Sequence, residues 1–194
     1  MNPVPRTVTI EELDRLYAAL PPRPQDSARV ISLNVRPGPA QREERDAIEF
    51  DPELGAAGDR WLRKTWLYLA DKRPDPRVQV AICNSRILSL IQEATGVRHH
   101  PGDTVFTDLD LAAANLPVGA RLRIGGAVIE VSNIENDACA KFAAHYGPVV
   151  LEWIRLPRNR ALRLRGLFAQ IVAGGTVRRG DEVCKAAWPS EPAS

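Results

Sequence analysis

The sequence predicts a mainly β fold, a closed or nearly closed β-barrel with a few peripheral helices. Many short segments alternate apolar and polar residues, and glycine-containing turns separate them. Only a few stretches have helical periodicity. The chain also has 16 prolines in 194 residues, which is too many interruptions for an all-helical fold. A β-sandwich is the alternative, whereas a parallel α/β sheet is disfavoured because strands and helices do not alternate regularly.

The N-terminal segment is predicted to be a short helix followed by a stiff linker. Thr9 and Glu12 fit a capping box, and apolar residues recur at helical spacing as far as Leu20. A proline-rich stretch then ends the helix. The expected organisation is a helix and Pro-rich linker over residues 1–27, the barrel domain over residues 28–188 and a disordered tail over residues 189–194.

The barrel domain is expected to contain eight strands and three helices, in addition to one short strand within residues 36–59. The predicted strands span residues 29–35, 77–83, 104–109, 121–124, 127–131, 163–172, 176–178 and 182–185. The predicted helices span residues 84–95, 139–145 and 149–154. Gly125-Gly126 between two strands is typical of a hairpin turn. Residues 36–59 resemble a loop with one short strand near residues 47–50, and residues 61–69 fit neither type of element.

Charge and cysteine usage exclude several classes of protein. The formal net charge is +2, which argues against a DNA coat protein or a polybasic membrane anchor. No signal peptide or membrane-spanning run is recognisable, so we expect a cytoplasmic protein without a membrane partner. Three cysteines without a CxxC pair argue against a disulfide framework and a structural zinc site.

The three cysteines differ in their surroundings. Cys83 ends an alternating strand and Cys184 lies in the last strand, so both are expected in the packing. Cys139 instead follows a strand end among small and charged residues. Its thiolate would be a soft metal ligand or a carrier of persulfide sulfur, and Lys141 would stabilise it. A small buried cysteine without a chemical role remains the alternative for Cys139.

Arginines are the next candidates for a binding site, because five of them fall between residues 155 and 165. Arg163 and Arg165 would project from the same face of the predicted strand, where their guanidinium groups suit phosphate oxygens. The other arginines of this stretch are interpreted as a solvated surface. Nucleic acid is not an expected partner, because the stretch lacks interleaved aromatic residues.

The remaining candidates allow more than one interpretation. Asp59 and Arg60 form either a structural ion pair or part of the barrel mouth. His99 and His100 are expected on the surface, since adjacent residues of an extended chain point in opposite directions. His145, six residues after Cys139, is either a proton donor near that thiol or unrelated to it.

An ordered set of motifs extends over residues 28–186. It comprises an early Gly-Asp-Arg, a Pro-Gly-Asp before a short strand, Leu-Pro-x-Gly before a hairpin, a Cys after the hairpin, an Arg-Gly entering a long strand, and a terminal Gly-Gly with Gly-Asp. This order resembles the MOSC family, named for the C-terminal domain of molybdenum-cofactor sulfurases. Members of this size are stand-alone bacterial domains, without the pyridoxal-phosphate domain of the sulfurases.

The resemblance implies a mainly β-barrel fold and a functional role for Cys139. In amidoxime-reducing relatives the corresponding cysteine ligates molybdenum, and in sulfurases it is thought to carry or receive sulfur. The resemblance therefore implies a molybdenum-pterin cofactor, with Lys141, Arg163, Arg165, Asp59 and Arg60 as candidates to bind it. Pyridoxal phosphate is not expected for this chain.

Two classes of function stay open from the sequence. The first is a cofactor-binding or sulfur-carrying domain that supports reduction of N-hydroxylated compounds, together with a redox partner or a cofactor-biosynthesis protein. The second is a non-catalytic barrel that binds a small anionic ligand or a protein. Whether the chain is an enzyme is left open at this point.

Overall fold

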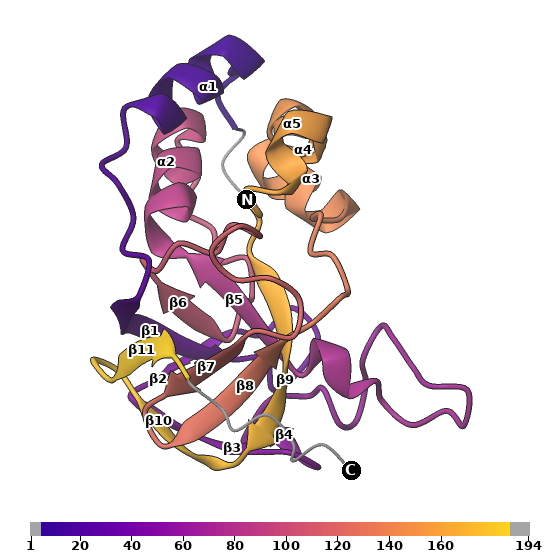
Figure 1. Ribbon diagram of the computed structural model, residues 1–194. Coiled ribbons are helices and arrows are strands. Elements are labelled where there is room, and N and C mark those ends of the chain that lie inside the picture. The colour runs from indigo at the N-terminus through magenta and orange to yellow at the C-terminus, as the bar shows by residue number, and fades with distance from the viewer. Residues whose placement is uncertain (1–4, 187–194) are drawn as a thin grey trace.

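The computed structural model describes residues 5–186, and Figure 1 shows a barrel of strands beneath a layer of helices. The strands are β1 (Ser27–Val35), β2 (Glu43–Arg45), β3 (Ala47–Asp51), β4 (Gly55–Ala56), β5 (Val80–Asn84), β6 (Val105–Thr107), β7 (Arg121–Ile124), β8 (Ala127–Val131), β9 (Leu167–Ala173), β10 (Gly175–Arg178) and β11 (Glu182–Lys185). The helices are α1 (Ile10–Ala18), α2 (Ser85–Thr95), α3 (Ala140–Tyr146), α4 (Pro148–Arg155), α5 (Pro157–Arg160) and the 3₁₀ helix η1 (Pro76–Val78).

Seven strands form a closed barrel, which confirms the predicted fold class. Their order is β11-β7-β8-β9-β5-β6-β1, and pairing of β1 with β11 closes the circle. Only β5 and β6 among these neighbours run parallel. Strand β2 extends the sheet beside β1, and β10-β3-β4 form a small second sheet. Closure leaves no free barrel edge that another chain could extend.

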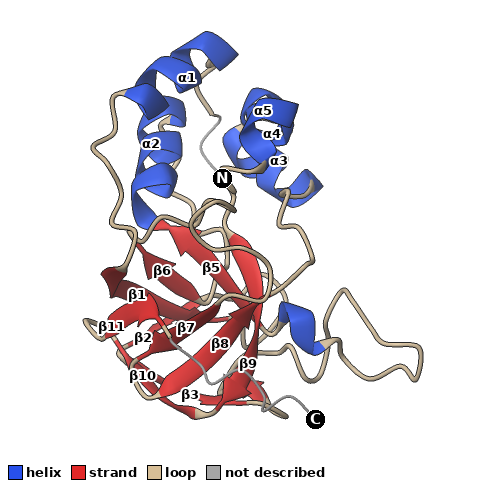
Figure 2. Cartoon of the chain, in the orientation of Figure 1, coloured by secondary structure: helices blue, strands red, loops and turns tan. Residues whose placement is uncertain are grey.

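Two apolar clusters hold the fold together. The first fills the barrel and includes Leu33, Ile82, Val105, Leu122 and Ile129, each fully buried. The second lies among the helices and joins α1, α2, α3 and α4 through buried apolar side chains. Figure 2 shows this division, with the main helices gathered above one end of the barrel.

Helix α1 is part of the helical layer. Leu13 is fully buried in the helical cluster, and the indole nitrogen of Trp153 in α4 donates to Asp14 at 2.9 Å. The side chain of Thr9 accepts from the amide of Glu12, as the capping box predicts. The N-terminal helix therefore covers apolar surface of α2 and α4. The predicted tail over residues 189–194 lies outside the described residues.

Several predicted elements are present with shifted boundaries. The β7–β8 hairpin matches its prediction, and Asn84 caps α2 by accepting from the amides of Arg86 and Ile87. The segment over residues 36–59 contains three strands, β2, β3 and β4, where we expected one. Residues 61–69 belong to a long loop before η1 that projects away from the barrel (Figure 1).

The strand predicted over residues 163–172 begins only at Leu167, so that prediction is wrong for its first residues. Residues 161–165 form turns instead. Arg163 has φ 48° and Gly166 has φ 104°, and neither value is compatible with a β-strand. A Cβ atom on Gly166 would lie 2.0 Å from the carbonyl oxygen of Ile82. Only glycine allows β9 to begin this close to β5.

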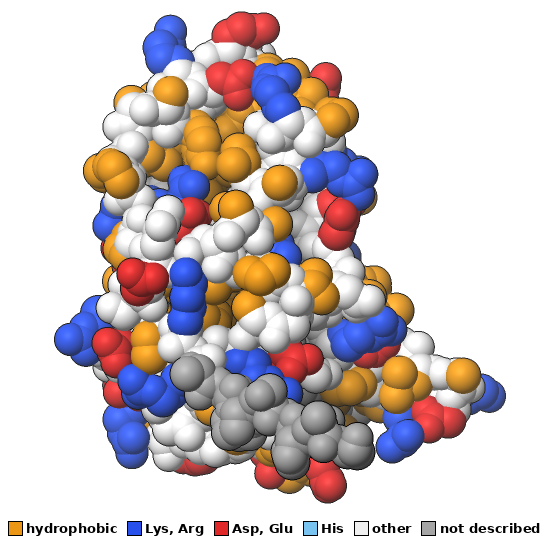
Figure 3. All heavy atoms as spheres, in the orientation of Figure 1, with side chains coloured by type: hydrophobic (Ala, Val, Ile, Leu, Met, Phe, Trp, Pro, Cys, Tyr) orange, Lys and Arg blue, Asp and Glu red, His pale blue; other side chains and the backbone are white. Residues whose placement is uncertain are grey.

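The outer surface carries charges of both signs. Figure 3 shows Lys and Arg interspersed with Asp and Glu on the face it presents, in keeping with the small net charge. Among the described residues, none of the helices has the length and apolar character needed to cross a membrane.

Candidate functional site

An ion pair between two loops forms the centre of the candidate site. Nη1 of Arg165, just before β9, donates to both carboxylate oxygens of Asp103, at 2.7 and 2.8 Å. The Asp103 side chain is fully buried and that of Arg165 is 11% exposed. Burial alone would lower the pKa of Arg165, but the carboxylate of Asp103 outweighs burial and raises it. Arg165 is therefore a permanent positive charge.

Unpartnered polar atoms surround this ion pair. Within residues 5–186, Nε of Arg165, Nε2 of His100 and Oγ1 of Thr104 are buried without a hydrogen-bond partner. Nδ1 of His100 accepts from the amide of Gly102 at 3.0 Å, which orients the ring. Buried polar atoms are ordinarily hydrogen-bonded in folded proteins. Several unsatisfied atoms in one place therefore indicate a position for a polar ligand.

Cys139 lies at the same end of the fold, immediately before α3. The residue is exposed, and its carbonyl oxygen accepts from the amides of Phe142 and Ala143. Its side chain makes no capping hydrogen bond, so the thiol is not engaged by the helix. Phe142 lies one turn further along, with its ring centroid 5.2 Å from Cζ of Arg165. The thiol of Cys139 also interacts electrostatically with Arg165, which places the two residues in one site.

A second group of arginines lies near the Arg165–Asp103 ion pair, in the segment of the chain that follows β1. Arg36 donates to both carboxylate oxygens of Asp59, at 2.9 and 3.0 Å. Burial lowers the pKa of Arg42, and the neighbouring charges of Arg36 and Arg60 lower it further. These three cations are therefore close to one another. We refer to Arg36, Arg42 and Arg60 as the arginine group.

Gly102 connects the arginine group to the central ion pair. A Cβ atom at Gly102 would lie 2.6 Å from Nε of Arg42, so this guanidinium lies directly against the Gly102 backbone. Arg42 also interacts electrostatically with Asp103. The absence of a side chain at Gly102 thus permits the cations to approach the loop that carries His100 and Asp103.

The histidines are placed differently from the prediction that His99 and His100 lie on the surface. Both are partly buried. The ring of His99 stacks on that of His145, with centroids 3.4 Å apart. Burial, together with the charges of His145, Arg42 and His100, lowers the pKa of His99 to about 4. Burial also lowers the pKa of His100. The imidazoles of His99 and His100 are therefore neutral at physiological pH.

Tyr146 fixes the position of the stacked histidines. Its hydroxyl donates to the carbonyl oxygen of His99, and burial raises its pKa to about 12. A protonated phenol can donate this hydrogen bond at any physiological pH. The segment that enters the Pro-Gly-Asp loop is thereby attached to α3.

The predicted site residues do not all converge. Cys139 and Arg165 share the site, and Asp59 and Arg60 belong to the arginine group or contact it. Lys141 is exposed on α3, and no ion pair to it is present among the described residues. Arg163 is not part of the site around Arg165 and Asp103, because its Nη1 donates to the carbonyl oxygen of Leu116 at 2.6 Å. The expectation that Arg163 and Arg165 project from one strand face is wrong, since both precede β9.

The other cysteines have no part in this site. Cys83 is buried, as predicted, and burial raises the pKa of its thiol. Cys184 is half-buried on β11 and accepts from Nη2 of Arg123 at 3.1 Å.

Sequence reasoning did not select Arg36, Arg42, His100, Asp103 or Thr104 as site residues. The signal for Asp103 was present in the Pro-Gly-Asp motif, because a buried carboxylate needs a cationic partner. In the same way, Asp59 in the motif Gly58-Asp59-Arg60 needs a cationic partner, but nothing in the sequence identifies this partner as Arg36. Within residues 5–186 no cluster of three or more His, Cys, Asp or Glu could hold a metal ion by itself.

Comparisons with known proteins bear on the fold and on the domain type of the C-terminal half. Residues 104–184 match the family described as "MOSC domain". None of the curated proteins matches the chain in sequence. Among solved structures, the chain is similar to the YuaD protein from Bacillus subtilis, with a TM-score of 0.60 and 23% identity over 81% of this chain and 94% of that one. It is also similar to YiiM from Escherichia coli, with a TM-score of 0.55 and 18% identity over 84% and 72% of the two chains.

These structural similarities establish a common fold, and the family match covers β6 to β11, including Cys139 and Arg165. Residues 104–184 of the chain therefore match the MOSC domain family, and the chain shares its fold with the YuaD and YiiM structures.

Proposed function

We propose that this site binds a molybdenum-pterin cofactor, with Cys139 as the thiolate ligand of the metal. One observation carries the proposal: an exposed cysteine shares a site with a buried arginine whose Nε has no partner among the described residues. Structural cysteines are generally buried and inert, whereas functional ones are accessible and lie in electropositive surroundings. Cys139 is accessible, and the cation of Arg165 lies close enough to interact with it electrostatically.

The residues of the site fit such a cofactor in two respects. The site offers a single thiolate and no cluster of further metal ligands among residues 5–186, which suits a metal that arrives with other ligands from its cofactor. A thiolate is a soft ligand appropriate for such a metal. The arginine group and the unpartnered donor of Arg165 suit an anionic, hydrogen-bonding molecule.

Each protein group would have a distinct task in that complex. Cys139 would hold the metal, and the arginine group would bind the anionic end of the cofactor. Arg165, held in place by Asp103, would direct its free Nε toward a cofactor acceptor. Asp59 would act as a positioning residue, because it accepts from the backbone and side chain of Arg36. The bound cofactor would supply two-electron chemistry suited to the reduction of N-hydroxylated compounds.

An accessible thiolate also suits the sulfur-carrying function of the family. In that case the Cys139 thiolate would attack the outer sulfur of a donor protein's persulfide, the donor's cysteine thiolate would leave, and the Cys139 persulfide would pass this sulfur on in the same way. Mass spectrometry of the native protein, before and after reduction, distinguishes this function from metal ligation.

Elemental analysis of protein made in a molybdenum-replete host tests the proposal. Wild type should contain molybdenum and a fluorescent pterin, and Cys139→Ala should lose the metal. Cys184→Ala is the matched control, because Cys184 is a partly exposed cysteine outside the site, and it should retain the metal. Stoichiometric molybdenum in Cys139→Ala would contradict the ligand assignment. Absence of both molybdenum and persulfide from wild type would contradict the proposed function.

A further inference from the structure

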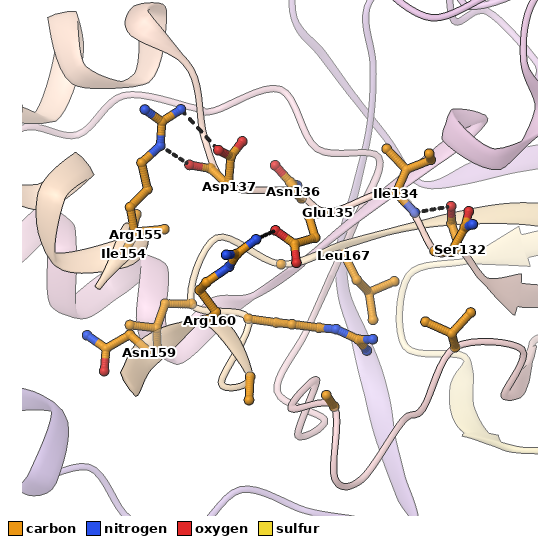
Figure 4. A pocket seen from close by; sticks show the side chains of 17 residues that line it. Ser132, Ile134, Glu135, Asn136, Asp137, Ile154, Arg155, Asn159, Arg160 and Leu167 are labelled. Atoms are coloured by element: carbon orange, nitrogen blue, oxygen red, sulfur yellow. Dashed lines mark hydrogen bonds and ion pairs between the residues drawn. The ribbon is translucent and has the colours of Figure 1, made fainter. Parts of the chain in front are cut away.

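A cavity of about 580 Å³ lies beside the site but does not include Cys139 or Arg165 among its lining residues. Its walls are formed by the loop that follows β8, by α4 and α5, and by the turns before β9 (Figure 4). Pockets for small molecules in proteins have volumes of roughly 300–1,000 Å³ and combine apolar walls with a few polar groups. This cavity has the volume and composition of such a pocket.

The charges of the cavity do not cancel. Arg160 pairs with Glu135 at 2.5 Å, and Arg155 pairs with Asp137 at 3.2 Å; Figure 4 shows both pairs. Arg163 is the third cation of the lining, and no carboxylate of the described residues pairs with it. Three guanidinium groups and two carboxylates leave one positive charge uncompensated.

The backbone conformation and the hydrogen bond of Arg163 hold this charge at the cavity. The Arg163 backbone has φ 48°, a conformation that residues other than glycine rarely adopt. Its Nη1 donates to the carbonyl oxygen of Leu116, which fixes the guanidinium group at the cavity. Burial lowers its pKa, and the nearby charge of Glu135 offsets this effect only in part. An anion in the cavity would remove this unfavourable condition.

Asn136 supplies a second group without a partner. Its Nδ2 is buried and makes no hydrogen bond within residues 5–186, and the residue lines the cavity between Glu135 and Asp137. An amide NH₂ donates and does not accept. Among the described residues, the cavity therefore presents one cation without a paired carboxylate and one amide donor without an acceptor, and acceptor oxygens of a ligand would suit both.

The rest of the lining defines the ligand further. Ile134, Ile154, Leu164 and Leu167 provide apolar surface, which favours a ligand with an apolar body. One uncompensated positive charge matches a monoanion better than a dianion such as phosphate. We propose that this cavity is a second ligand site, which binds a small monocarboxylate with an apolar body through Arg163 and Asn136.

Nuclear magnetic resonance titration of the full, ¹⁵N-labelled chain tests this site with three probes of equal shape: benzoate, benzamide and benzylammonium. Benzoate should shift the side-chain resonances of Asn136 and Arg163 saturably, and benzamide should bind at least about tenfold more weakly, because a hydrogen bond to a charged group contributes about 1.5–3 kcal/mol. Benzylammonium should not shift these resonances. Equal binding of benzoate and benzamide, or benzoate shifts confined to other residues, would overturn the proposal.

Two variants test the assigned residues. Arg163→Gln should weaken benzoate binding about tenfold or more. Because Arg163 also supports the backbone at Leu116, Asn136→Asp is the second variant: it preserves shape but places a carboxylate against the ligand, and it should likewise lose benzoate. Arg178→Gln, an exposed arginine on β10, is the control and should bind benzoate as wild type does. Unchanged affinity in Asn136→Asp would overturn the assignment.

This inference is independent of the proposed cofactor. Cys139→Ala should bind benzoate with wild-type affinity, since Cys139 does not line the cavity. The two proposals therefore fail separately: loss of molybdenum without loss of benzoate concerns only the cofactor site, and the reverse concerns only the cavity.

Discussion

Arg165 donates from a single guanidinium nitrogen to both carboxylate oxygens of Asp103, whose side chain is fully buried. The pair joins the loop before β6 to the turn before β9. Attraction between buried charges has to offset their loss of hydration. Removal of either partner therefore lowers the free energy of unfolding by more than the number of lost hydrogen bonds suggests.

Asp103→Asn should lower the free energy of unfolding by about 3–5 kcal/mol, because it leaves the Arg165 charge buried without a counterion. Urea denaturation followed by tryptophan fluorescence measures the change. Glu182→Gln is the control, since the Arg123–Glu182 pair is largely exposed and should contribute less than about 1 kcal/mol. Similar losses in the two variants would contradict the importance of burial at Asp103.

Gly166→Ala should destabilise the protein by more than about 2 kcal/mol, because both the strained backbone and the approach to Ile82 oppose a Cβ atom. Gly180→Ala is a matched comparison. Gly180 also has a positive φ, 84°, but a Cβ atom there would meet nothing within 4 Å, so only a strain of about 1–2 kcal/mol is expected. Thermal unfolding of both variants gives the comparison. Equal losses would show that contact with β5 does not matter.

Thiol labelling of the native protein should show one rapidly reacting cysteine, Cys139, because it is exposed. Cys83 should react only on unfolding, since it is buried and its thiol pKa is raised. A chromogenic disulfide reagent measures these rates. Cys139→Ala should lose the rapid phase and Cys184→Ala should keep it. A rapid phase that survives in Cys139→Ala would show that another thiol is the accessible one.

Acid should destabilise the protein through His99. Its pKa is about 4 in the folded protein, against 6.5 in the absence of burial, so the unfolded state binds more protons between these values. Stability should therefore fall as the pH decreases from about 6.5 to about 4. His99→Gln should reduce this slope in urea denaturation, while the contributions of the carboxylates persist. Parallel pH profiles for wild type and variant would contradict the assignment to His99.

Leu13→Ala should cost about 2–5 kcal/mol, because Leu13 is fully buried and truncation leaves a cavity in the helical cluster. Leu54, which is 61% exposed, is the control, and Leu54→Ala should change stability by no more than about 0.5 kcal/mol. Chemical denaturation measures both. A wild-type value for Leu13→Ala would show that α1 is dispensable for the fold.

Most of the elements that were predicted correctly follow from local sequence patterns. The β7–β8 hairpin follows from Gly125-Gly126 between two alternating segments, and the limits of α2 follow from Asn84 and Gly96. These features depend on interactions within a few residues, which a sequence displays directly. Strand β9 was extended too far because the alternation before Leu167 resembles a strand. A close contact with Ile82, more than 80 positions earlier, decides where it begins.

The amino-acid sequence by itself determined the class of fold and set Cys139 apart from the other two cysteines, since both rest on residue type and local order. Tertiary structure decided which charges meet. Arg165 is 62 positions from Asp103, and Arg163, although only two positions from Arg165, belongs to a different cavity. Attraction between charges depends on distance and burial in space, and barrel closure sets both.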